Sequence, residues 1–131
     1  MSKKPARTHL SDAEWKVMQV VWRRAPVTAR DVREALLAET GWAHTTVKTL
    51  LTRLCAKGAL GETRVGNASS YTPAVAEDAA RRSALRAFAE RAFGGDLVPM
   101  VRFMIEEREL SPRDRARLRR ALDDDAPEPR P

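Results

Sequence analysis

The stretch from Trp42 to Pro73 constrains the fold of this chain more than any other. Its first half places apolar residues at the spacing of one helix face: Val47, Leu50, Leu51 and Leu54. The opposite face carries hydroxyls and bases: Thr45, Thr46, Lys48, Thr49, Thr52 and Arg53. No acidic residue lies between His44 and Gly61. Such a helix can bury its leucines and present hydrogen-bond donors and positive charge to an anionic partner.

A small β-hairpin is predicted directly after this helix. Lys57-Gly58 ends the helix, with Gly58 as a left-handed cap. Gly61–Val65 and Ser70–Thr72 are expected to pair around a four-residue tip, Gly66-Asn67-Ala68-Ser69, whose glycine and asparagine are typical of tight turns. A helix followed by such a hairpin is typical of a winged helix-turn-helix, in which the hairpin is the wing.

Two more helices precede this one, as a helix-turn-helix requires. The first is predicted from Leu10 to Arg24, with Ser11 and Glu14 forming a capping box. The second begins at Thr28, with an acid three residues later, and runs to about Ala38. Before the third helix, Ala43 has no side-chain oxygen to cap it. We therefore expect Thr45 to cap that helix and to move its start by two residues.

The chain beyond Pro73 is predicted to be helical to about Asp123. Three helices are expected, at about 76–93, from Leu97 onward, and from Ser111-Pro112, where a cap precedes a first-turn proline. These three helices contain few large apolar side chains, and so small a segment rarely makes a self-sufficient core. These helices could fold back on the winged part or pair with a second copy, and we favour pairing. The candidate dimerisation residues are Leu85, Phe88, Phe93, Leu97, Met100, Val101, Met104, Leu118 and Leu122.

The charge of the chain is unevenly divided. Residues 1–73 hold 12 Lys and Arg against 6 Asp and Glu, whereas residues 74–131 hold 12 of each. The whole net charge of +6 therefore lies in the half that carries the candidate reading helix, which favours nucleic-acid binding over a merely basic surface.

Composition also excludes several classes of protein. No apolar run approaches the roughly 20 residues that span a bilayer, so no membrane insertion is expected. The first ten residues lack the apolar core of a signal peptide. One cysteine and two histidines form no recognisable metal site, and we expect no metal, no cofactor and a cytoplasmic location. No motif typical of catalysis is present, so an enzyme is not expected.

These patterns predict a mainly α fold with a small β-wing, divided into four parts. Residues 1–9 are a disordered basic arm, and residues 10–73 are a winged helix-turn-helix DNA-binding domain. Residues 74–123 are a helical dimerisation domain, and residues 124–131 are a disordered acidic tail rich in proline.

The candidate DNA contacts come from the third helix and the wing. Arg53 is placed to reach a phosphate or a guanine edge, with a salt bridge to Glu62 or Glu39 as the alternative. Thr49 is placed for a thymine methyl or a phosphate. The full set of candidates is Thr45, Thr46, Lys48, Thr49, Thr52, Arg53, Arg64 and Asn67. For Thr45 and Thr46 capping is an equal alternative, and Asn67 has the alternative of a plain turn residue.

Several stretches resemble the penicillinase repressors, the BlaI/MecI/CopY family of bacterial regulators. LSDAEWKVMQVVW (10–22) is similar to the first helix of the family, and TVKTLLTRLCAKGAL (46–60) to its recognition helix. YTP (71–73) follows the wing. FGGDLVPMV (93–101), with ELS at 109–111, is similar to the dimerisation region. The FGG-x-L element behind a TLLTRL helix is the most specific part, and the resemblance covers about residues 10–123.

The resemblance implies a homodimeric repressor that binds double-stranded DNA at a palindromic operator. In several members a membrane sensor-protease triggers cleavage in the fifth helix, and the matching bond here is Phe103-Met104. This chain has Arg102 before Phe103, where the cleaved members carry an Asn-Phe pair. The copper-responsive members use a cysteine-rich C-terminal motif, which residues 74–131 lack. The alternative function is a winged-helix module that binds protein and makes no specific contact with DNA.

Overall fold

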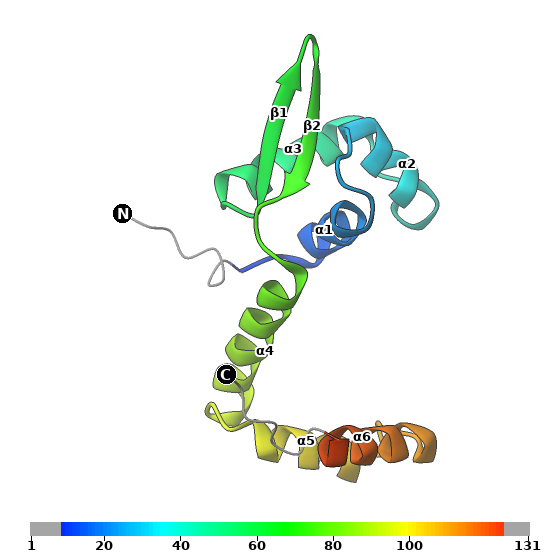
Figure 1. The fold of residues 1–131 in the computed structure, drawn as a ribbon, viewed down its shortest axis with the longest axis vertical. Helices are drawn as coiled ribbons and strands as arrows, with labels where there is room; N and C mark the ends of the chain where they lie inside the picture. Colours follow the sequence, from blue (N-terminus) through cyan, green and yellow to red (C-terminus); the bar gives the residue numbers. More distant parts are fainter. Residues whose placement is uncertain (1–8, 125–131) are drawn as a thin grey trace. The chain divides into compact units, whose positions relative to one another are not determined.

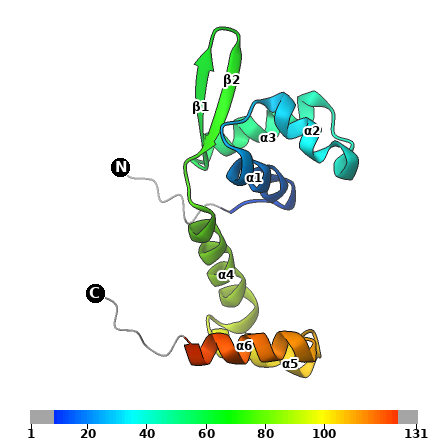
Figure 2. The ribbon, with the colours of Figure 1, turned by 45° about the vertical axis from the view of Figure 1, so that its right-hand side comes forward.

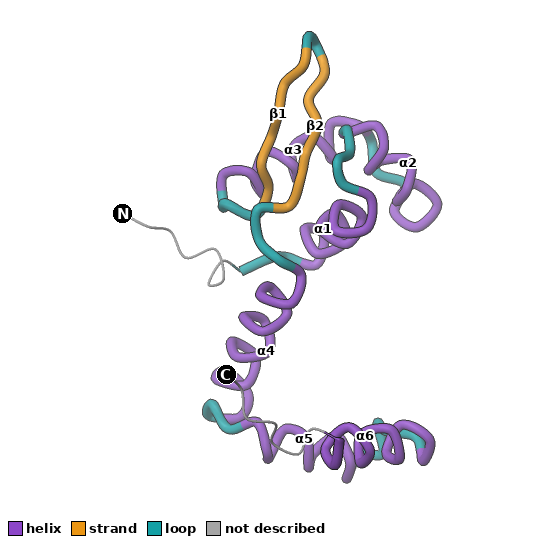
Figure 3. Tube along the Cα trace, in the orientation of Figure 1, coloured by secondary structure: helices purple, strands orange, loops and turns teal. Residues whose placement is uncertain are grey.

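The computed structural model describes residues 9–124, and the predicted basic arm and acidic tail fall almost entirely outside this range. In chain order the elements are α1 (Asp12–Arg24), α2 (Ala29–Thr40), α3 (His44–Ala56), β1 (Leu60–Val65), β2 (Ala68–Pro73), α4 (Glu77–Phe93), α5 (Leu97–Glu106) and α6 (Pro112–Asp124) (Figures 1 and 3). The predicted mainly α fold with a small β-wing is confirmed. The chain forms two compact units that divide within α4, between Arg86 and Ala87. The domain limits predicted from the sequence stay a prediction.

The first two helices use the caps that the sequence predicts, although α1 begins at Asp12 and not at Leu10. The Ser11 hydroxyl accepts a hydrogen bond from the Glu14 N–H, and the Glu14 carboxylate accepts one from the Ser11 N–H, so the capping box is complete. Thr28 and Asp31 form the same arrangement at the start of α2. Gly41, with φ of 67°, ends α2 in the left-handed conformation that glycine adopts without strain. Short polar caps therefore fix both helices of the pair that supports α3.

The start of α3 differs from the sequence-based expectation. The helix begins at His44 after an extended Ala43, and no side chain caps it. Thr45 lies inside the first turn, so the expected two-residue shift is wrong. A cap contributes only about 1 kcal/mol, whereas the buried Val47 of the first turn is fixed by core packing. Burial of Val47 outweighs the missing cap.

The wing is a two-stranded antiparallel hairpin that projects beyond the helices of its unit (Figure 2). Its register pairs Val65 with Ala68, so the turn consists of Gly66 and Asn67 alone. The predicted four-residue tip was too long, because Ala68 and Ser69 continue the strand. Gly66 has φ of 64°, which a two-residue hairpin with glycine at its first turn position requires. The base of the hairpin is joined to the chain before α2, because Val27 and Tyr71 exchange both backbone hydrogen bonds, at 3.1 and 2.7 Å.

One apolar core holds the winged unit together. It takes residues from α1, α2, α3, the hairpin and the segment after it, and its members with the least exposed surface are Val17, Met18, Val21, Val32, Val47, Leu51 and Leu54. The three tryptophans, Trp15, Trp22 and Trp42, pack partly buried against this core. Each helix thus keeps one face free for solvent or a partner.

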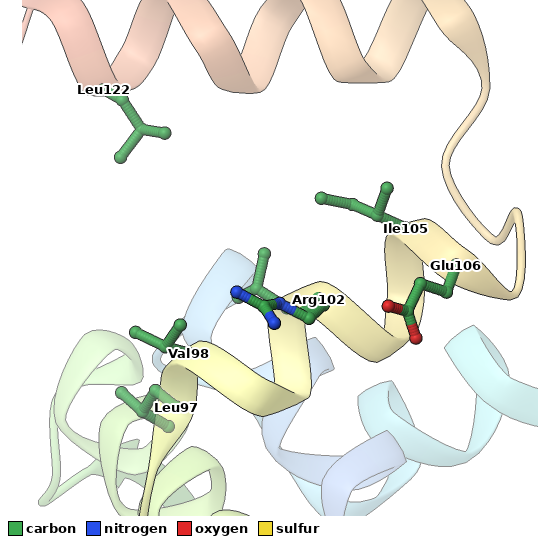
Figure 4. A pocket seen from close by; sticks show the side chains of 7 residues that line it. Leu97, Val98, Arg102, Ile105, Glu106 and Leu122 are labelled. Carbon is green, nitrogen blue, oxygen red and sulfur yellow. The ribbon is translucent and has the colours of Figure 1, made fainter.

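The second unit has no comparable core. None of the residues of α5 or α6 is buried. Asp96 caps α5 and Ser111 caps α6 through hydrogen bonds to backbone N–H groups. A groove of about 560 Å³ lies between the two helices, and Figure 4 shows Ile105 of α5 and Leu122 of α6 beside it. Of the predicted dimerisation residues, Leu85, Phe88, Val101, Met104 and Leu122 are exposed, and Phe93, Leu97, Met100 and Leu118 are half-buried. Among the described helices, none is long and apolar enough to cross a membrane.

A partly buried ion pair joins the beginning of α1 to the end of α3. The Glu14 side chain is 3% exposed, and its Oε1 lies 2.6 Å from Nζ of Lys57. The same ammonium donates to the His9 carbonyl at 2.8 Å. Burial alone would raise the pKa of the Glu14 carboxyl, but the bonds and charge supplied by Lys57 and Ser11 outweigh it and lower that pKa.

We expect Glu14→Gln to weaken the fold at neutral pH by about 1–3 kcal/mol, because Lys57 loses its buried anionic partner. The lowered pKa makes the carboxylate stabilising above the pKa of the unfolded chain, and this contribution disappears as the pH falls through the folded pKa. Thermal unfolding between pH 7 and pH 3 should therefore show a shallower acid loss in the variant. Glu39→Gln is the control, because Glu39 forms an exposed pair with Lys16. An equal acid loss in the parent and in Glu14→Gln would contradict this assignment.

Candidate nucleic-acid interface

The outward face of α3 is formed by the residues that the sequence singled out. Val47, Leu50, Leu51 and Leu54 are buried. All six predicted contact residues of this helix are exposed: Thr45, Thr46, Lys48, Thr49, Thr52 and Arg53. The structure thus brings about two and a half turns of hydroxyls and bases to one surface. An α-helix of this width fits the major groove of B-DNA, where such side chains can reach base edges and phosphates.

The basic residues of this surface are not engaged by the protein itself. Within residues 9–124, no hydrogen bond or ion pair holds the side chain of Lys48 or of Arg53. The two acids proposed as alternative partners of Arg53 are used elsewhere: Glu39 pairs with Lys16, and Glu62 accepts a hydrogen bond from the Ser69 hydroxyl at 2.5 Å. The salt-bridge alternative for Arg53 is therefore wrong. Its guanidinium remains available for an external anion.

The first turn of α3 adds backbone donors to the same surface. Thr45 and Thr46 are the second and third residues of the helix, and no side chain caps its N–H groups. The capping alternative for these two threonines is therefore wrong. Uncapped N–H groups and the positive end of the helix dipole favour a phosphate. The sequence did not predict this backbone contribution, because the missing cap suggested that α3 begins two residues later.

Two contacts from outside α3 hold the ends of this helix. The Arg33 Nε donates to the Trp42 carbonyl at 3.0 Å, which fixes the connection from α2 to α3. Lys57 follows α3 and reaches the buried Glu14 of α1. Sequence reasoning missed both contacts, because they join residues that are not related by helical or strand spacing. Together they keep the outward face of α3 in a fixed position on the unit.

The wing supplies the remaining candidates. Arg64 and Asn67 are both exposed, Arg64 near the tip and Asn67 in the turn. Strand alternation puts Arg64 on the hairpin face that carries the buried Tyr71. Val65, at the end of β1, is 72% exposed, which is unusual for an apolar residue in a small unit. The position of Val65 beside the predicted turn already indicated that its side chain would be exposed, but the sequence-based predictions did not include it.

Cys55 belongs to the inner side of this region. It is half-buried, and burial together with the nearby Glu62 carboxylate raises the pKa of its thiol. A raised pKa keeps the thiol protonated and unreactive near neutral pH. Burial and Glu62 likewise raise the pKa of the Tyr71 hydroxyl. Both groups are thus neutral parts of the packing between α3 and the wing.

Comparison with known proteins places the chain in one family. Residues 10–124 match the sequence model of the family described as penicillinase repressor. The penicillinase repressor of Bacillus licheniformis is 33% identical over 102 residues, which are 78% of this chain and 80% of that protein. The methicillin resistance regulatory protein MecI of Staphylococcus aureus strain N315 is 26% identical over 113 residues, 86% of this chain and 92% of that protein.

A solved structure agrees with the winged unit. The solution structure of the DNA-binding domain of the repressor BlaI is 35% identical to this chain, with a TM-score of 0.51. The match covers 60% of this chain and 93% of that domain. The family match, the exposed basic face of α3 and the projecting wing all lead to the same assignment: the chain belongs to the penicillinase repressor family and is a DNA-binding transcriptional repressor.

Proposed function

We propose that this repressor acts as a homodimer that reads a palindromic operator with two copies of α3. The observation that carries the proposal is the exposed, acid-free face of α3, on which the Lys48 and Arg53 side chains have no partner within residues 9–124. A single reading helix covers only a few base pairs, and a two-fold dimer doubles both the site and its contacts. We infer a cytoplasmic location, where a repressor of this family would meet its operator.

The proposed contacts divide by chemistry. Phosphate is bound at the start of α3 by Lys48, Thr45 and Thr46, together with the backbone N–H groups of the first turn. These contacts position the helix. Arg53 and Thr49 lie one turn apart on the exposed face and read base edges, with Thr52 beside them. Arg64 and Asn67 of the wing bind the backbone next to the groove. Phosphate contacts supply much of the affinity, and the α3 face supplies discrimination.

The proposed dimer interface lies on α4, α5 and α6. A soluble protein rarely leaves this many large apolar side chains in water without a partner. Phe88 is 47% exposed, Phe103 is 52% exposed and Leu122 is 69% exposed in the single chain. We add two exposed residues of α5, Val98 and Phe103, to the dimerisation residues predicted from the sequence. A second copy of the chain that carries the same apolar surface would cover them by symmetry.

Relief of repression by a membrane sensor-protease is the further part of this proposal. The bond Phe103-Met104 lies inside α5, and both side chains are exposed. The Phe103 ring contacts the Phe93 ring, with centroids 6.0 Å apart. A cut there would separate Val101 from Ile105 and divide the apolar stripe of α5. Cleavage would thus remove the proposed interface without touching the DNA-binding unit.

We expect Arg53→Ala to weaken operator binding by about 1–3 kcal/mol if Arg53 reads a base. The loss on random DNA should be much smaller, since only a phosphate contact is independent of sequence. Arg53→Lys is the matched variant, because lysine keeps the charge but lacks the planar two-donor fork. Titration of both variants on operator and random duplexes at several salt concentrations separates the two roles. Equal losses on both duplexes for Arg53→Ala would leave Arg53 with a phosphate contact alone.

We expect Val101→Asp to shift the protein from dimer to monomer, because it puts a charge in the middle of the exposed stripe of α5. Arg120→Asp is the control, since Arg120 is an exposed residue of α6 that is two positions away from both Leu118 and Leu122. Sedimentation equilibrium reports the change directly. A dimer that survives Val101→Asp with unchanged affinity would place the interface elsewhere.

A chain that ends at Phe103 imitates the product of the proposed cleavage. We expect it to be monomeric and to bind an isolated half-site as well as the full chain does. Its affinity for the complete operator should fall by at least about tenfold, because the second half-site no longer adds to binding. Undiminished operator binding by this shortened chain would contradict relief by cleavage at this bond.

A further inference from the structure

The segment between the wing and α4 is fixed to the winged unit at two backbone positions. The Ala74 N–H donates to the Ala59 carbonyl at 2.8 Å, just before the wing. The Val75 carbonyl accepts a hydrogen bond from the indole N–H of Trp22, at 3.0 Å. Trp22 is a residue of α1, 53 positions earlier in the chain. The chain is therefore held from two different elements immediately before α4 begins.

Side-chain packing strengthens this attachment. Val75 is 9% exposed and belongs to the apolar core of the winged unit, and Ala79, in the first turn of α4, packs against that core. The Trp22 ring also lies beside that of Trp15, with centroids 5.9 Å apart and planes inclined at 55°. We call the Trp22–Val75 hydrogen bond and the packing of Val75 and Ala79 the α4 joint.

The direction of α4 matters because this helix is one continuous element of 17 residues. At 1.5 Å per residue it is about 25 Å long. A change of about 10° at its first turn would move its far end by about 4 Å. This displacement is close to the rise of one base pair, about 3.4 Å. The far half of α4 carries Phe88 and Phe93, which belong to the proposed dimer interface.

We propose that the α4 joint sets the distance between half-sites that the repressor accepts, with Trp22 as its positioning residue. The inference rests on the proposed dimeric function. In a dimer joined through the second unit, the first turn of α4 determines where each winged unit stands on the DNA. Trp22 makes no contact with DNA in this account. It acts through Val75 on the path of α4, and so selects operators by their spacing and not by their bases.

The test uses the full chain and a series of DNA duplexes. Each duplex carries two copies of the selected half-site, and the spacer between them changes by one base pair at a time. A duplex with one half-site serves as the reference for each protein. Trp22→Phe removes the indole donor and keeps an aromatic ring. Trp15→Phe is the matched control, because Trp15 belongs to the same ring pair and its indole makes no hydrogen bond within the described residues.

We expect the parent and Trp15→Phe to prefer one spacing over its neighbours by at least about tenfold. Trp22→Phe should bind the single half-site within about twofold of the parent, and its preference among spacings should fall below about threefold. A merely structural role of Trp22 would lower binding to every duplex equally. An unchanged spacing profile in Trp22→Phe would overturn the proposal, and so would an equal flattening by Trp15→Phe.

A second variant protects the test from a folding defect. One glycine inserted between Ala76 and Glu77 leaves Trp22 and Val75 in place and frees α4 from the joint. It should flatten the spacing profile and leave half-site binding intact, and a sharp profile in this variant would overturn the proposal. Failure of the dimeric function looks different, because the parent itself would then bind two half-sites no better than one. In that case both proposals are wrong.

Discussion

Burial of one stripe of α3 is the interaction on which the rest of this structure depends. Val47, Leu50, Leu51 and Leu54 are each 5% exposed or less. Each contributes roughly 1.5–3 kcal/mol by leaving water. Their burial fixes the rotation of α3 about its own axis, and this rotation turns Thr49 and Arg53 outward. One hydrophobic constraint therefore produces both the core and the surface that can face DNA.

The polar contacts of the winged unit leave that surface free. Glu14 and Lys57 pair with each other beneath it, and Glu39 and Glu62 are held by Lys16 and Ser69. An acid directed at the outward face of α3 would neutralise Arg53 and repel phosphate. None of these carboxylates pairs with Arg53. Lys48 and Arg53 therefore keep their charge on the surface where the uncapped first turn of α3 adds its own donors.

Local patterns in the sequence predicted most of the fold, and tertiary contacts account for what they missed. The helix caps can be found from the sequence alone, because each cap acts on backbone groups only a few residues away. They are Ser11 with Glu14, Thr28 with Asp31, and Gly58 after α3. The predicted start of α3 was wrong, because the burial of Val47 determines where this helix begins. The contacts of Lys57 with Glu14 and of Trp22 with Val75 join distant residues and leave no periodic signal. The exposed face of α3 was predictable, since a 3.6-residue period specifies its buried stripe and its exposed residues together.

Selection of bound sequences from a random DNA pool, with the full chain at near-physiological salt, tests the central claim most directly. We expect enrichment of a two-fold palindrome whose half-sites lie about one helical turn apart, or a multiple of it. Binding to that sequence should survive salt concentrations that abolish binding to random DNA. Enrichment of no sequence, with weak binding that salt removes entirely, would contradict the reading of an operator by α3.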